Sequence, residues 1–179
     1  RYLGGEEIPR DEVIAALKKA VAAGSIVPLF VGSASLTFGM RALLTKMVEI
    51  FPAAADVPPP VDAPLLGRVF KTTSEPHVGD VTLFRLYAGT LKNGADVWNA
   101  EHEVAEKLNH LSVQQGRERT EVGVLHAGDI GSVAKLRDTH TGDTFCLRDA
   151  PVRLSPIPFP EAVASAAVVV KQRGEEDKL

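Results

Sequence analysis

The hydrophobic positions of the first fifty residues follow the periods of an α/β unit. The pattern over residues 9–24 predicts an amphipathic helix that begins at Pro9 and ends at Gly24. Residues 25–34 form a short apolar run that predicts a buried strand. Residues 38–52 again space apolar side chains by three and four, so we expect a second helix that stops at its last proline. The apolar face of the first helix is made by Ile14, Leu17 and Val21.

From residue 65 onward the hydrophobic period shortens to that of β-strands. Short runs rich in branched and aromatic residues alternate with turn signals, of which Asn93-Gly94 is the strongest. About six such strands at this spacing predict a closed antiparallel β-barrel. The fold class expected for the whole chain is therefore mainly β, with an α/β unit in front of the barrel.

Proline clusters set the expected domain boundaries. Residues 53–64 carry clustered prolines, which favour a stiff, extended linker. A second cluster around residue 158 ends the barrel, and residues 159–179 predict a strand followed by the first turn of a helix. We therefore expect an α/β remnant in residues 1–52, the linker, a barrel in residues 65–158, and the start of a further α+β domain.

Composition and charge narrow the function classes. The formal net charge of −3 excludes a uniformly basic nucleic-acid-binding surface, so any RNA contact has to come from a local patch. The single cysteine, Cys146, excludes an internal disulfide and predicts a small buried side chain in a reducing cytosol. No apolar run approaches the ~20 residues that span a bilayer. The sequence begins without an initiator Met and stops where a new element begins, so a fragment is expected.

Two stretches are candidates for binding. The turn at residues 31–35 follows a predicted strand, and it can be a plain turn, a ligand contact or, with Ser33, a nucleophile; it lacks the G-x-S-x-G pattern of a hydrolase. The polar loop at residues 114–122 carries Arg117 and Arg119, with Lys107 upstream. These cations can contact RNA phosphates, but two glutamates in the same loop make a solvated loop an equal alternative.

No catalytic or metal motif is present in the sequence. The histidines have no metal-ligand spacing, and residues 137–144 lack the ligand order of a calcium loop, so no metal site is predicted. The sequence has no P-loop, no D-x-x-G and no N-K-x-D. The chain alone is therefore not expected to hydrolyse a nucleotide. The histidines are His77, His102, His110, His126 and His140.

Four segments resemble the elongation factor G family of translational GTPases. "IVPLFVGSAS" with the helix after it resembles the end of that family's G domain, and "PLLGRVFKTTSEPHVGDVTLFRLYAGTLKNGADVWN" the opening of its second domain. "HAGDIGSVAKLRDTHTGDTF" is similar to a later segment of the second domain and is the most specific of the four. "PFPEAVASAAVVVKQRGEEDKL" resembles the entry to the third domain.

The resemblance implies a fold, a cofactor and a partner. It implies a translation-factor-type β-barrel as domain II, and GTP or GDP bound by the full-length protein but not by this fragment. Ser33, Ala34 and Ser35 match the guanine-contacting element, and Lys107, Arg117 and Arg119 are the candidate contacts to ribosomal RNA. The implied partner is the ribosome, through its small-subunit RNA and its proteins, and the fragment is expected to be a cytoplasmic monomer with no membrane contact.

The segment at residues 126–145 is expected to be two strands with tight turns in a rigid barrel. Its glycines allow sharp corners, and Asp129 and Asp143 brace those corners through hydrogen bonds to the backbone. The corner glycines are Gly128, Gly131 and Gly142, and the side chains expected to fill the interior or an interdomain face are Ile130, Val133, Leu136 and Phe145.

Three other interpretations remain open. A ribosome-protection or release factor of the same superfamily would carry the same domains. A self-standing β-barrel could bind protein or RNA without any nucleotide. An independent hydrolase would use Ser33.

Overall fold

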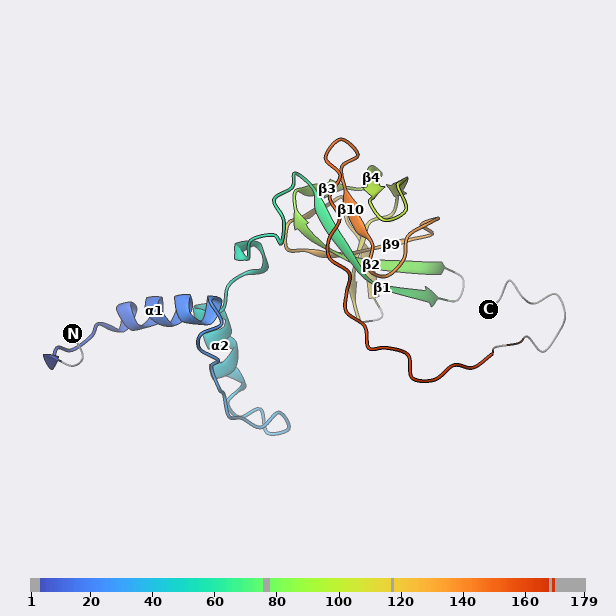
Figure 1. Cartoon of the computed structure of the whole chain (residues 1–179). Coiled ribbons are helices and arrows are strands. Elements are labelled where there is room, and N and C mark those ends of the chain that lie inside the picture. Colours follow the sequence, from blue (N-terminus) through green and yellow to red (C-terminus); the bar gives the residue numbers. More distant parts are fainter. Residues whose placement is uncertain (1–3, 76–77, 117, 168, 170–179) are drawn as a thin grey trace.

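The computed structural model describes residues 4–75, 78–116, 118–167 and 169. Figure 1 shows a helical part and a strand-rich part joined by an extended connection. The helical part holds α1 (Arg10–Ala22) and α2 (Met40–Ile50), and the connection contains a 3-10 turn (Ala54–Asp56). The strands are β1 (Leu66–Glu75), β2 (Gly79–Ala88), β3 (Thr90–Lys92), β4 (Ala95–Asn99), β5 (Val104–Leu108), β6 (Ser112–Gln115), β7 (Glu118–Glu121), β8 (Val124–His126), β9 (Ile130–Ala134) and β10 (Thr144–Cys146).

Both predicted helices are present. Helix α1 begins directly after Pro9, whose fixed φ suits a helix start, and its last turns are followed by Gly24 in the left-handed region. Helix α2 begins after Gly39, which has a φ of +78°, and it ends two residues before Pro52. The two helices contact one another, with Arg10 Nη2 4.0 Å from Glu49 Oε1.

The strand predicted at residues 25–34 is wrong. Val27, Leu29 and Val31 are 87%, 90% and 86% exposed, and the segment has no ladder of strand hydrogen bonds in the described structure. Its β contact is an isolated bridge between Ser33 and Phe38. The apolar run has strand propensity, but a strand forms only where a neighbouring strand accepts and donates its backbone hydrogen bonds, and among the described residues this run has only that one bridge.

The strand-rich part is one curled antiparallel sheet completed by a two-stranded ribbon. The large sheet has the order β5-β4-β10-β1-β2-β9-β6-β7, and the ribbon pairs β3 with β8. Strands β1 and β2 are the long central hairpin, with Val69 opposite Phe84 and Arg68 opposite Arg85. The mainly β, barrel-type architecture expected from the sequence is thus confirmed.

The barrel is less regular than the sequence suggested. Strands β5 and β7 are edges of the large sheet and pair with a single neighbour each, so the described ladder is a curled half-barrel rather than a closed ring. The chain leaves the large sheet at Gly89, whose φ is +83°, and β3 then pairs with β8 instead of continuing β2. Strands of three residues carry too little periodicity to be predicted, which explains why the sequence indicated fewer strands.

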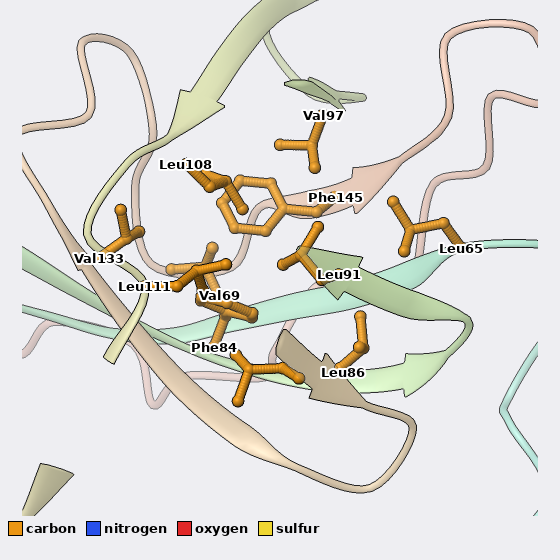
Figure 2. Close-up of a cluster of buried hydrophobic side chains, with 11 residues drawn as sticks. Leu65, Val69, Phe84, Leu86, Leu91, Val97, Leu108, Leu111, Val133 and Phe145 are labelled. Carbon is orange, nitrogen blue, oxygen red and sulfur yellow. The ribbon is translucent and has the colours of Figure 1, made fainter. Parts of the chain in front are cut away.

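The hydrophobic core lies between the curled sheet and the ribbon. Figure 2 shows side chains from both converging, with the Phe145 ring among Val97, Leu91 and Leu108. The rings of Phe84 and Phe145 meet edge to face at 5.5 Å. The core consists of Leu65, Val69, Phe84, Leu86, Leu91, Val97, Leu108, Leu111, Leu125, Val133 and Phe145.

The segment at residues 126–145 follows most of its expected roles. Gly128 and Gly142 have φ values of +98° and +107° at tight turns, while Val133 and Phe145 are buried and Leu136 packs against the core. Ile130 was expected in the interior or on an interdomain face. It is 51% exposed and so does not fill the interior, since the buried positions of β9 fall on the residues after it.

Gly131 is a glycine for a different reason from the one expected. It lies inside β9 without a positive φ, and an added Cβ would lie 2.3 Å from Leu125 Cδ1 and 3.0 Å from Phe84 Cζ. Close packing across the sheet, and not a corner, therefore requires the missing side chain.

We expect Gly131→Ala to lower the free energy of unfolding by about 1–3 kcal/mol, because the new methyl group overpacks the core. Urea denaturation of Gly131→Ala, Leu125→Ala and the double variant measures this. The double variant should lose less stability than the sum of the single variants, because Leu125→Ala removes the clashing atom. Additive losses would contradict the packing explanation.

The strand predicted after residue 159 is absent from the described residues, where 151–167 and 169 have no regular structure. The reason is again that no described strand pairs with this segment. The predicted helix turn at residues 174–179 lies outside the described residues. The segment just after β10 is held against the barrel at Ser155. The guanidinium of Arg68, on β1, donates to the carbonyls of Gly142 (2.9 Å) and Ser155 (2.6 Å).

Candidate functional site

The first candidate site is the loop between the helices. The backbone N–H of Ser33 donates to the carbonyl of Phe38 (3.0 Å), which closes the loop at its base. The two arms touch at Gly32 and Gly39: a Cβ at Gly32 would lie 2.7 Å from Phe38 O, and one at Gly39 would lie 2.9 Å from Val31 O. The glycines that flank the loop are therefore required by this close approach of two backbone segments.

Ser33, Ala34 and Ser35 form the tip of this loop. Ser33 Oγ accepts a long hydrogen bond from Leu36 N–H (3.4 Å) and lies 3.3 Å from Ser35 Oγ. Within the described part of the chain, the N–H groups of Ala34 and Ser35 donate to no backbone carbonyl, and both residues are exposed. The loop therefore presents small side chains and two exposed residues whose N–H groups have no backbone acceptor, which suit a carbonyl or other acceptor on a ligand.

No general base contacts Ser33 in the described structure. The contacts of its hydroxyl are Leu36 N–H and Ser35 Oγ, and neither can take its proton. The geometry favours a turn or a ligand contact over a nucleophile.

The candidate RNA-contacting cations do not share one strand. Lys107 is exposed on β5 and lies opposite Asp96 of β4, whereas Arg119 lies on β7, at the other edge of the large sheet. Arg119 Nη2 donates to Glu75 Oε2 at 3.0 Å. Arg117 lies outside the described residues. The side chain of Arg119 is therefore paired with the carboxylate of Glu75. Contacts of Lys107, Arg117 and Arg119 with RNA stay predictions.

Buried polar residues, which sequence reasoning missed, hold the loop between β9 and β10. Glu106 is 4% exposed, and its Oε1 accepts three hydrogen bonds from this loop. The donors are the backbone N–H groups of Arg137 (3.0 Å) and Asp138 (2.8 Å) and the hydroxyl of Thr139 (3.1 Å). We call these four residues the Glu106 network. The sequence did hold a signal for this network. Glu106 occupies a buried position in the alternation of β5, on the same side as Val104 and Leu108, where a charged residue needs partners.

Asn99 connects the same loop to β4. Its side-chain amide donates to Asp143 Oδ2 (2.8 Å) and to the hydroxyl of Thr139 (3.2 Å), and its carbonyl oxygen accepts from Glu101 N–H (3.0 Å). Asp143 Oδ2 also accepts the backbone N–H of His140 at 2.7 Å. This bond, and the matching one from His126 N–H to Asp129 Oδ2 (2.7 Å), confirm that both aspartates brace their turns.

Cys146 is inert in this arrangement. The residue is fully buried, its Sγ lies 3.5 Å from the carbonyl oxygen of Trp98, and burial raises the pKa of the thiol. The expected role as a small buried side chain is confirmed, and the raised pKa disfavours the reactive thiolate.

Comparison with known proteins defines the class of this barrel. Residues 64–148 match the family described as elongation factor G domain 2. A solved structure of a protein from Thermus thermophilus matches with a TM-score of 0.69 and 30% identity, covering 88% of this chain and 24% of that one. The chain thus spans about a quarter of the length of that protein.

The curled antiparallel sheet and this match define the barrel as similar to the second domain of a translation factor. More closely, residues 64–148, which form the whole of the curled sheet, match elongation factor G domain 2, and further segments lie on either side of the match. Within the described residues, no helix is long and apolar enough to cross a membrane.

Proposed function

We propose that the chain is part of an elongation factor G, the GTPase that promotes ribosomal translocation during protein synthesis. In this proposal the barrel docks on small-subunit ribosomal RNA and couples the nucleotide state of a G domain to later domains. The observation that carries the proposal is the domain 2 match over the whole of the curled sheet. The full-length protein would bind GTP and GDP in the cytoplasm, and its partners would be ribosomal RNA and ribosomal proteins.

A coupling domain has to move as a unit, and the buried contacts of the barrel support that role. The Glu106 network and Asn99 fix the β9–β10 loop, while Arg68 fixes the chain at Ser155 as it leaves the barrel. Buried side chains that satisfy backbone donors and acceptors make local opening costly. A displacement at the linker would therefore reach the C-terminal exit without being absorbed by these loops.

The guanine contact is the second part of the proposal. Ser33, Ala34 and Ser35 would line one edge of the base, with the N–H groups of Ala34 and Ser35, which have no backbone acceptor, as donors to its carbonyl oxygen. The phosphate-binding motifs would lie elsewhere in the full-length protein, since this sequence carries none.

We expect Lys107→Glu in the full-length protein to weaken binding to small ribosomal subunits, because it replaces a phosphate-binding cation with a repelling carboxylate. The slope of log K against log salt should become shallower by about 1, because the variant neutralises one phosphate fewer. Affinity titrations across a salt series measure both. Lys92→Glu is the matched control, because Lys92 is also exposed on a strand, in the β3–β8 ribbon. Equally weakened binding in both variants would contradict a specific role for Lys107.

The related factors are distinguished by activity. An elongation factor G should drive GTP-dependent movement of a labelled messenger RNA through the ribosome. Drug displacement or peptide release in place of messenger movement would instead assign the protein to a ribosome-protection or release factor.

A further inference from the structure

The fold brings together two histidines and an aspartate that are far apart in the sequence. His102 lies in the turn between β4 and β5, whereas His140 and Asp143 lie in the loop before β10. One ligand atom from each lies within 4.8 Å of the other two. The imidazole rings are 5.1 Å apart and tilted by 51°.

The separations of these atoms match those of a metal coordination sphere. His102 Nε2 lies 3.4 Å from His140 Nδ1 and 3.4 Å from Asp143 Oδ2. Ligands that each lie about 2.0–2.1 Å from a tetrahedral zinc ion are separated from one another by about 3.3–3.4 Å. Both distances from His102 therefore suit ligands of one cation, and the ligand atoms of His140 and Asp143 lie within 4.8 Å of one another.

The aspartate is already fixed for this role. Its side chain is 7% exposed, and Oδ2 is held by the Asn99 amide (2.8 Å) and the His140 backbone N–H (2.7 Å). Hydrogen bonds orient the carboxylate ligands of known metal sites. Because these two bonds use both lone-pair sites of Oδ2, the cation would replace one of them or bind through Oδ1. His102 is 37% exposed, so a metal ion and a water molecule can reach the site from solvent.

We propose that His102, His140 and Asp143 bind a transition-metal ion, with Zn²⁺ as the best fit to two imidazoles and one carboxylate. Water would take the fourth position. The bound ion would join the β4–β5 turn to the β9–β10 loop. The Glu106 network already holds the earlier part of that loop. The proposal is independent of the proposed ribosomal function, since it rests on the barrel alone.

The test is titration of the untagged, chelator-treated chain with Zn²⁺, followed by calorimetry and by thermal unfolding. We expect one Zn²⁺ per chain and a rise in Tm with increasing Zn²⁺, because an ion that binds only the folded state stabilises it. His102→Ala and His140→Ala should each weaken the affinity at least tenfold. Co²⁺ should give the visible absorption of a tetrahedral site, which reports ligation without reference to stability.

His110→Ala is the matched control, because His110 is also exposed and lies 3.3 Å from a carboxylate oxygen of Glu121. It should leave Zn²⁺ affinity unchanged. Zn²⁺ binding that survives both ligand substitutions, or no binding at all, would overturn the proposal and leave a hydrogen-bonded cluster of His102, His140 and Asp143. Far-ultraviolet circular dichroism confirms that each variant is folded.

Discussion

Replacing Phe84 with alanine is expected to lower the free energy of unfolding of the barrel by about 3–5 kcal/mol. Phe84 is fully buried, and it packs edge to face against Phe145 at 5.5 Å. The residue paired with Phe84 on β9 is Gly131, where an added Cβ would lie 3.0 Å from Phe84 Cζ, so this neighbour has no side chain to move into the space. The truncation therefore removes both the transfer free energy of the ring and the packing around the cavity that it leaves.

Urea and thermal unfolding measure this effect, and we expect Tm to fall by more than about 10 °C, given the size of the barrel. Phe70→Ala is the matched control, because Phe70 lies in the adjacent strand but is 38% exposed. Phe70→Ala should lower the free energy of unfolding much less than Phe84→Ala does. A similar loss of stability in both variants would show that the barrel does not depend on the core around Phe84.

The elements predicted well are those whose signal is local. Helix α2 has an apolar face at helical spacing and a proline just beyond its end. Both signals lie within the segment that forms the helix, so they can be recognised from that segment alone. Strand β2 likewise alternates buried and partly exposed side chains from Thr82 to Tyr87. Such patterns need no knowledge of the rest of the fold.

The failures arise where a neighbour decides the structure. Residues 25–34 have the composition of a strand, but hydrogen-bonding partners are not a property of the segment itself. Gly131 is expected at a corner from the glycine pattern, whereas its place inside β9 depends on which face of the strand meets Leu125 and Phe84. Register across a sheet is set by such packing, and a shift of one residue exchanges the two faces.

The candidate sites divide in the same way. The loop of Ser33, Ala34 and Ser35 could be singled out because its residues are contiguous. The cluster of His102, His140 and Asp143 could not, since a separation of almost forty residues has no recognised ligand spacing until the sheet brings the two loops together. Predicted metal sites depend on short motifs, and this one is made by tertiary structure.

The Glu106 network is the second feature with a large expected effect. Glu106→Ala should lower the free energy of unfolding by about 2–4 kcal/mol, because it leaves three donors in and beside the β9–β10 loop without their acceptor. Glu106→Gln retains an oxygen at the same place and should recover much of the stability. The comparison separates the missing acceptor from the missing charge.

Hydrogen exchange shows whether the destabilisation is local. The amides of Arg137 and Asp138 donate to Glu106, so they should exchange faster in Glu106→Ala, while amides of the β1–β2 hairpin change only as far as global stability falls. Glu118→Ala is the control, since Glu118 is exposed on the edge strand β7 and should change stability by less than about 0.5 kcal/mol. Unaltered exchange at Arg137 and Asp138 would mean that the loop is held by Asn99 and the turn at Asp143, and that Glu106 is not what makes the barrel rigid at this end.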